Sequence, residues 1–225
     1  MSPTSIESTL RARAGRLRDP KAIADILEQP FILAGGAMRP AMPRDYDIFG
    51  CDRPIDLSEV ECRCRERIDI VVLTTTDNAV TIDHKGQTIQ LCKHFKPTAL
   101  GLVDSFDFSH VQAGVVFDGE GRMADAVYTG AFENVELNHE IPCYTGSEYP
   151  LSALARLVKF KNRGDFWSSG EGYFVAQIMA IFCDIVRRGF TDEDDFCAQC
   201  AAISTSFAYV DPTELYDLLK KEGEK

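Results

Sequence analysis

The segment 31–49 constrains the fold of this chain more than any other. It starts with the apolar run 31–34, continues through Gly35-Gly36 and ends in a second strand-like run that carries Asp45 and Asp47. A residue without a Cβ atom permits a tight turn and lets backbone N–H groups approach a ligand closely. Side chains alternate along a strand, so Asp45 and Asp47 point to the same face. The segment therefore predicts a strand that ends in a glycine turn and a next strand that carries two carboxylates on one face.

These residue types suit a phosphate and a divalent cation. Backbone N–H groups at such a turn can bind a phosphate, and magnesium usually takes one or two carboxylates together with substrate phosphates. A glycine pair alone marks an ordinary turn, and paired acids alone are common in solvated loops. Together, in this order and between apolar runs, they predict a site for a metal ion and a triphosphate.

A third acid, Asp107, lies between two phenylalanines in the run 106–117, which we expect to form one long strand. A charge in an apolar run costs free energy unless it is paired or binds a cation. Asp107 could cap or pair locally. If it instead lies across the sheet from Asp45 and Asp47, the three carboxylates form a cage for two metal ions. Such ions, about 3.5–4 Å apart, can activate a hydroxyl and stabilise a leaving pyrophosphate.

Composition limits the class of protein. The chain has 225 residues, 45% of them hydrophobic, which is enough for one large domain or two small ones. The net charge is −11, from 35 acidic and 24 basic residues. Such a charge repels polyanions, so we do not expect tight non-specific binding to duplex DNA. No run approaches the roughly 20 apolar residues of a membrane span, and we see no signal peptide. We therefore expect a cytoplasmic protein without membrane contact.

Eight cysteines are scattered through helix-like and strand-like segments. Without a secretion signal, reduced thiols are expected. Cys62-Arg63-Cys64 together with Cys92-Lys93-His94 could supply four zinc ligands, and Cys197 with Cys200 could supply two more. Zinc ligands are normally spaced by two to four residues. The ligands of the first set are separated by one residue, the second pair needs further ligands from elsewhere, and zinc binding is left open.

Residue periodicity predicts an α+β fold, a mixed-sheet domain over 1–147 followed by a helical domain over 148–225. From Pro150 onward the apolar residues recur with a period of 3.6, which is typical of helices. Strands are expected over 31–34, 45–49, 68–73, 79–83, 88–92 and 106–117. Helices are expected over 4–18, 19–29, 58–67, 97–105, 150–163, 171–188, 191–206 and 211–222.

The order of these motifs resembles that of the polymerase-beta-like nucleotidyltransferase superfamily, most closely the head and neck of bacterial CCA-adding enzymes and poly(A) polymerases. Those proteins show a GGAxR segment, a PxDxDI strand, an RRDFTINA strand, a G-x-L-x-D turn and a PLRxLRxxRFxxRxGF helix. The matching segments here are 35–39, 43–48, 106–113, 121–125 and 150–164. The chain is also similar to compact nucleotidyltransferase-like proteins of phage genomes, whose DSFDF strand and RxxKYxxRG helix match 104–108 and 156–164.

This resemblance implies a nucleotidyltransferase domain over 1–147 that moves a nucleoside monophosphate from an NTP, such as ATP, to an acceptor hydroxyl. The acceptor would be an RNA 3′ end or a small molecule. The resemblance implies that Gly35 and Gly36 hold the triphosphate. It also implies that Asp45, Asp47 and Asp107 are catalytic and bind Mg²⁺ or Mn²⁺. The residues that would neutralise phosphate charge are Arg39, Arg44, Arg156 and Lys159. The basic helix that carries the last two could instead be only a solvated surface.

The chain also departs from the family pattern. Only eight residues separate Gly36 from Asp45, fewer than in CCA-adding enzymes, so we expect a shortened helix between them. Ser105 and Phe106 stand where those enzymes have two arginines. We therefore expect an activity other than complete CCA addition. Two alternatives are a catalytically inactive module that binds nucleotide or a protein partner, and an enzyme that modifies a protein side chain. Neither the preferred NTP nor the oligomeric state follows from the sequence.

Overall fold

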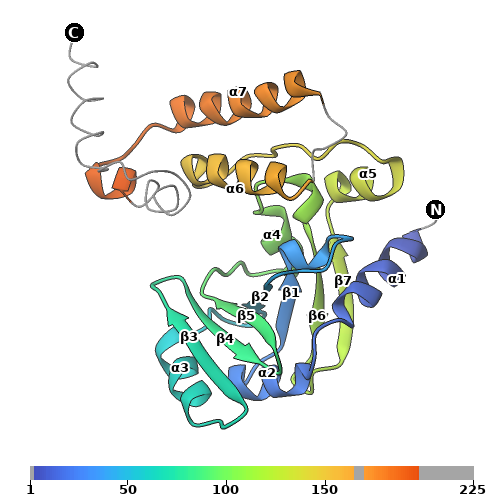
Figure 1. The fold of residues 1–225 in the computed structure, drawn as a ribbon, viewed down its shortest axis with the longest axis vertical. Helices are drawn as coiled ribbons and strands as arrows, with labels where there is room; N and C mark the ends of the chain where they lie inside the picture. The colour runs from blue at the N-terminus through green and yellow to red at the C-terminus, as the bar shows by residue number, and fades with distance from the viewer. Residues whose placement is uncertain (1–2, 165–169, 198–225) are drawn as a thin grey trace. The chain divides into compact units, whose positions relative to one another are not determined.

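The structure, a computed structural model, describes residues 3–164 and 170–197 (Figure 1). The chain divides into two compact units, Met1–Glu140 and Ile141–Lys225. The first unit is a mixed sheet with helices, and the described part of the second is helical, which confirms the α+β class. The predicted domain boundary at 147/148 stays a prediction.

A mixed sheet of seven strands forms the centre of the first unit, in the order β3-β4-β5-β2-β1-β6-β7. Strands β2 and β5 run parallel, and the other neighbouring pairs are antiparallel. A parallel pair needs a crossover connection, which is provided here by one helix and the strands β3 and β4 (Figure 1). The strands are β1 (Phe31–Ala34), β2 (Tyr46–Gly50), β3 (Ile70–Thr75), β4 (Ala79–His84), β5 (Gln87–Cys92), β6 (Ala113–Phe117) and β7 (Met123–Tyr128).

Helices contribute to a hydrophobic core on each face of this sheet. Residues of α1, α2, α3 and α5 belong to the larger core, and residues of α4 belong to a smaller one. The helical elements of this unit are α1 (Pro3–Ala14), α2 (Pro20–Leu27), η1 (Gly35–Met38), α3 (Leu57–Arg65), α4 (Ala99–Asp104), η2 (Ser109–Val111) and α5 (Gly130–Asn138). In the described part of the chain, no helix is both long and apolar enough to cross a membrane.

The strand register decides which side chains face which core. Leu33 pairs with Ile48, and both lie in the larger core. The neighbouring pair, Ala34 with Asp47, faces the opposite side because side chains alternate along a strand. Ala34 belongs to the smaller core. Asp47 therefore lies on the face that carries the smaller core.

In the second unit, the described helices α6 (Pro150–Asn162) and α7 (Glu171–Arg188) pack against each other. Pro150 is at the first turn of α6, where its missing N–H would have no helical partner. Ala153, Leu157 and Phe160 are buried at helical spacing.

Helices α6 and α7 were both predicted from the sequence. The predicted helix 191–206 is described only to residue 197, and residues 193–197 are helical. The remainder of that helix and the predicted helix 211–222 lie outside the described residues.

The prediction of one long strand over 106–117 is wrong. Strand β6 begins only at Ala113, and Asp107 lies in a bend that precedes η2. The side-chain amide of Gln112 donates hydrogen bonds to the carbonyl of Phe106 (2.7 Å) and to the carbonyl of Asp104 (3.3 Å). These carbonyls therefore accept hydrogen bonds from a side chain. In a strand they would accept them from N–H groups of a neighbouring strand.

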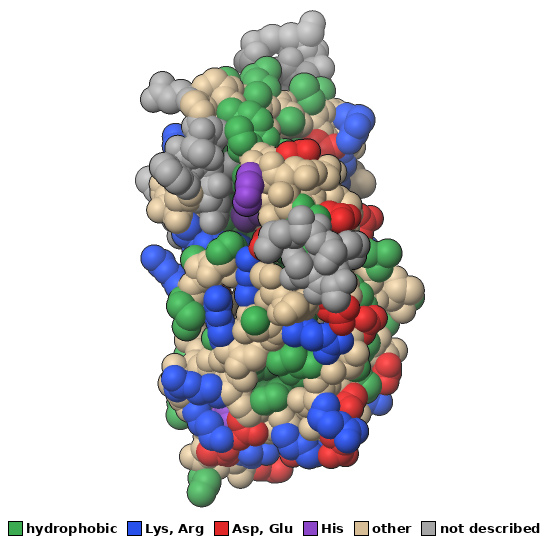
Figure 2. All heavy atoms as spheres, turned by 90° about the vertical axis from the view of Figure 1, so that its right-hand side faces the viewer, with side chains coloured by type: hydrophobic (Ala, Val, Ile, Leu, Met, Phe, Trp, Pro, Cys, Tyr) green, Lys and Arg blue, Asp and Glu red, His purple; other side chains and the backbone are tan. Residues whose placement is uncertain are grey.

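Acidic and basic side chains are mixed on the surface of the first unit. In the lower part of the face shown in Figure 2, Lys and Arg side chains lie beside Asp and Glu side chains. Ion pairs of this unit include Arg11 with Glu7 and Arg122 with Asp118, both at 2.9 Å. Exposed pairs of this kind contribute little to stability.

Replacing Asp19 by Ala should lower the free energy of unfolding by about 1 kcal/mol near neutral pH, because Asp19 caps α2. Its Oδ1 accepts a hydrogen bond from the Ala22 N–H at 3.2 Å, and its Oδ2 pairs with Lys85. The hydrogen bond from Lys85 holds the pKa of Asp19 below its usual 3.8. A carboxyl with a lowered folded-state pKa stabilises the protein above its unfolded pKa, and this stabilisation is lost as pH falls through the folded value.

The stability difference between wild type and Asp19→Ala should therefore shrink below a pH of about 3.8, as measured by urea unfolding over a pH series. The control is Asp19→Asn, which keeps a capping oxygen and removes the charge. A difference between wild type and Asp19→Ala that stays constant through the acid range would contradict this assignment.

Candidate functional site

The glycine turn predicted from the sequence follows β1 directly. Gly35 has φ +67°, a conformation that residues with a side chain rarely adopt. A Cβ atom built on Gly35 would lie 3.5 Å from Oδ2 of Asp47 and 3.8 Å from the ring of Phe106. A Cβ atom built on Gly36 would meet no atom within 4 Å. The turn therefore packs against Asp47 on one side and borders open space at Gly36.

The short interval between Gly36 and Asp45 contains only one helical turn, η1, as its length predicted. Asp45 is the residue before β2, and Asp47 is the second residue of β2. Both side chains are half-buried. Burial raises the pKa of the Cys92 thiol, and the negative charges of Asp47 and Asp45 raise it further. The charges of both carboxylates therefore affect the Cys92 thiol at the end of β5, the strand parallel to β2.

Asp107 is held on a segment that contacts the same turn. Its neighbour Phe106 approaches Gly35, and the ring centroids of Phe106 and Phe49 are 5.6 Å apart. Asp107 itself is 8% exposed. The segment is braced by Gln112, which binds the carbonyl of Phe106 and accepts a hydrogen bond from the Thr129 hydroxyl at 2.9 Å.

In residues 3–164 and 170–197, no group of three or more His, Cys, Asp and Glu side chains is arranged to hold a metal ion. Asp107 is therefore not gathered with Asp45 and Asp47 into such a group, and neither is the set formed by Cys62, Cys64, Cys92 and His94. The three-carboxylate cage stays a prediction. The other candidate pair includes Cys200, which lies outside the described residues.

The predicted basic residues are distributed over both units. Arg39 follows η1, is buried, and donates its backbone N–H to the Gly36 carbonyl at 3.4 Å. Arg44 is exposed. Arg156 and Lys159 lie on α6 of the second unit, where Arg156 is half-buried and Lys159 is exposed. The structure thus places Arg39 at the glycine turn, and the role of all four residues in phosphate binding stays a prediction.

Arg13 is a residue of this region that the sequence did not single out. Its guanidinium donates to the carbonyl of Met38, the last residue of η1, at 2.6 Å, and it pairs with Glu136 of α5. The spacing of buried residues along α1 could have indicated it. Ile6, Leu10 and Arg13 follow one another at helical spacing, so Arg13 falls on the buried face of α1.

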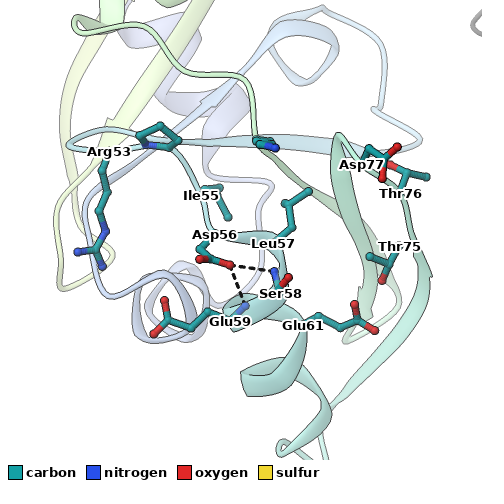
Figure 3. Close-up of a pocket in the computed structure, with 12 residues that line it drawn as sticks. Arg53, Ile55, Asp56, Leu57, Ser58, Glu59, Glu61, Thr75, Thr76 and Asp77 are labelled. Atoms are coloured by element: carbon teal, nitrogen blue, oxygen red, sulfur yellow. Dashed lines mark hydrogen bonds between the residues drawn. The ribbon is translucent and has the colours of Figure 1, made fainter. Parts of the chain in front are cut away.

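A hollow of about 940 Å³ opens at the opposite end of β2, where residues 53–59 meet the ends of β3 and β5 (Figure 3). The carboxylate of Asp56 points to the N-terminus of α3 and accepts hydrogen bonds from the N–H groups of Ser58 (3.0 Å) and Glu59 (3.1 Å). Glu59 is in turn paired with Arg63. None of the site residues predicted from the sequence lines this hollow.

No protein-family model matches this chain, and no curated protein matches it. Solved structures match it in fold. A CCA-adding enzyme with ATP aligns at a TM-score of 0.53 and 14% identity, over 91% of this chain and 51% of that chain. A CCA-adding enzyme with CTP aligns at 0.52 and 14% identity, over 95% and 53%. The apo form I of a CCA-adding enzyme aligns at 0.53 and 13% identity, over 95% and 53%.

The present chain spans about half the length of these structures. At this level of identity the match shows a shared fold. The nucleotidyltransferase-like fold that the order of the sequence motifs predicted is thereby confirmed.

Proposed function

We propose that this protein is a metal-dependent nucleotidyltransferase that moves a nucleoside monophosphate from an NTP to an acceptor hydroxyl, on an RNA 3′ end or a small molecule. The observation that carries the proposal is the turn at Gly35-Gly36, which lies against Asp47 and borders open space. The shared fold adds support, because two of the matching structures are complexes of CCA-adding enzymes with ATP and with CTP.

The triphosphate would lie at the open side of Gly36, where a Cβ atom would otherwise intrude. Backbone N–H groups of the turn would donate hydrogen bonds to its oxygens. Arg39, held at the end of η1, would neutralise part of its charge. Gly35 allows the chain to reverse at φ +67° without moving away from Asp47.

The residues present fit a magnesium ion. Asp45 and Asp47 are half-buried carboxylates beside the turn, and magnesium commonly binds one or two carboxylates while its other ligands are water and phosphate. When bound there, the ion would offset the charge that develops on the leaving pyrophosphate. We assign to Asp107, which is buried and follows Phe106 in the sequence, the role of accepting the proton of the acceptor hydroxyl.

The test is incubation of the full chain with each of the four α-labelled NTPs, with Mg²⁺ or Mn²⁺, in the presence of total RNA. Label should appear on RNA only when a divalent cation is present. Label on a protein band would instead support the modification of a protein side chain. A folded protein that shows no label and no Mg²⁺-dependent NTP binding by calorimetry would contradict the proposal and favour an inactive binding module.

Replacing Gly36 by Ala should weaken binding of Mg²⁺-NTP about tenfold, because the new methyl group occupies the space assigned to a phosphate and separates it from a backbone donor. The melting temperature should not change, since the methyl group meets no protein atom within 4 Å. The measurement is calorimetric titration together with thermal unfolding. Gly130→Ala, at a glycine that also borders open space, is the matched control and should bind as wild type does. Equal affinities of the two variants would count against a phosphate at Gly36.

A further inference from the structure

The helix α1 is connected to the glycine turn through a buried arginine. Arg13 is 7% exposed. Its Nη1 donates to the carbonyl of Met38 at 2.6 Å. Its two terminal nitrogens also donate to the two carboxylate oxygens of Glu136, at 3.0 and 2.6 Å. One side chain therefore links α1, α5 and the end of η1.

The geometry of this link leaves the guanidinium little freedom. Two hydrogen bonds from a planar guanidinium to one carboxylate fix its orientation, which a lysine cannot reproduce. A buried ion pair contributes little net stability, because removing both charges from water costs free energy. The arrangement is thus better explained by the position it imposes on the Met38 carbonyl than by stabilisation of the fold.

A second connection joins the segment that follows α1 to the strand with the acidic residues. Arg16 donates to the carbonyls of Pro40 and Ala41, both at 3.3 Å. Its own carbonyl accepts hydrogen bonds from the Tyr46 hydroxyl (3.3 Å) and from the Gln87 amide (2.8 Å). Tyr46 is the residue between Asp45 and Asp47 in the sequence, so the segment after α1 contacts both the loop that precedes β2 and the first residue of β2.

We propose that Arg13 is a positioning residue of the nucleotide site: oriented by Glu136, it fixes η1 through the Met38 carbonyl and so holds the glycine turn against Asp47. The identity of the ligand depends on the proposed function, whereas the restraint on the turn depends only on the hydrogen bonds of Arg13.

A glycine pair needs such a restraint. Glycine loses more conformational freedom on ordering than other residues, and a turn that is ordered only when the ligand binds lowers the affinity by the cost of ordering. A turn that is fixed beforehand avoids this cost. Loss of the Arg13 restraint should therefore appear as weaker nucleotide binding and as faster opening of the turn in the free protein.

The experiment compares Arg13→Gln with Arg11→Gln in the full chain. Arg11 lies on the same helix and binds the carbonyls of Met123 (3.1 Å) and Ala124 (3.2 Å) on β7, so its loss removes hydrogen bonds of the same kind elsewhere. Two quantities are measured: the Kd for Mg²⁺-ATP by calorimetry, and hydrogen exchange of residues 35–43 without ligand by mass spectrometry. Arg13→Gln should raise the Kd at least about tenfold, and it should accelerate exchange in 35–43. Arg11→Gln should leave both within about twofold of wild type.

Two further variants keep the test decisive if Arg13→Gln does not fold. Glu136→Gln preserves the shape of the partner and should raise the Kd by a smaller factor, while Arg13→Lys should restore binding only in part. Unchanged Kd and unchanged exchange in Arg13→Gln, or in Glu136→Gln if only that variant folds, would overturn the proposal. If wild type itself does not bind Mg²⁺-ATP, the proposed function fails, and hydrogen exchange then decides the restraint. Faster exchange confined to 35–43 supports the restraint, and exchange equal to wild type overturns it.

Discussion

Replacing Asp47 by Asn should reduce nucleotidyl transfer at least about 100-fold while the protein stays folded. Asparagine has nearly the same shape, so the packing against Gly35 is retained. It has no negative charge, however, and an amide oxygen is a weaker ligand for Mg²⁺ than a carboxylate. Asp47 has the required position, because its Oδ2 lies beside the glycine turn on the face with the smaller core. The initial rate of label transfer from NTP is the measurement.

The matched control for this prediction is Asp83→Asn. Asp83 lies on β4, where it pairs with Thr88 of β5. Across the sheet, Asp47 aligns with Gln90 of β5 and then with Thr81 of β4. Because Asp83 is two residues from Thr81, Asp83 and Asp47 face the same side of the sheet. The Asp83 carboxylate accepts a hydrogen bond from the Gly86 N–H at 3.3 Å, and its strand, β4, is separated from β2 by β5. Asp83→Asn should keep transfer within about twofold of wild type. Wild-type rates in Asp47→Asn would refute its role as a metal ligand.

Elements with a strong local pattern could be predicted from the sequence. The five predicted strands from 31–34 to 88–92 are present with ends shifted by no more than two residues, and α7 has the predicted bounds. The hairpin between β4 and β5 turns at Lys85-Gly86, with φ of +53° and +71°. Proline and glycine flank β1, glycines flank α7, and buried residues alternate along β4 and β5, so the local pattern is sufficient to locate these elements.

Elements whose pattern is weak or is overridden by a distant contact could not be predicted. Strand β7 lies at the edge of the sheet and has no buried residue, so it lacks the alternation that marks a strand. The run 106–117 has the composition of a strand, but Gln112 binds the carbonyls of Asp104 and Phe106 and directs the chain into η2. A single side chain thus changes the conformation of the segment that carries Asp107.

In the candidate site, too, local features could be predicted from the sequence and distant contacts could not. The order of the motifs was sufficient to expect Gly35 beside Asp47, because the glycine turn directly follows β1 and Asp47 lies on the neighbouring strand β2. The pair of Arg13 with Glu136 joins residues 123 positions apart, and no local pattern specifies such a pair. What the sequence did not provide is therefore mainly the support of the site, which depends on how separate helices pack.

The hairpin between β6 and β7 gives the second large effect. Replacing Gly121 by Ala should lower the free energy of unfolding by about 3 kcal/mol, which corresponds to a fall in Tm of roughly 6–12 °C for a chain of this size. Gly121 has φ +73°, which is strained for alanine. Its Cβ atom would also lie 2.5 Å from the backbone nitrogen of Lys21 and 2.7 Å from the carbonyl carbon of Pro20, at the start of α2.

Neither side of this contact can move easily. The hairpin is held by Asp118, whose carbonyl accepts from the Gly121 N–H and whose Oδ1 accepts from the Arg122 N–H, both at 2.9 Å. On the other side, the ring of Pro20 restricts the backbone at the first turn of α2. The control is Gly119→Ala in the same hairpin, where a Cβ atom would meet nothing within 4 Å. Its stability, measured by thermal and denaturant unfolding, should stay within about 0.5 kcal/mol of wild type. If Gly121→Ala were as stable as Gly119→Ala, the close packing of this hairpin on α2 would be refuted.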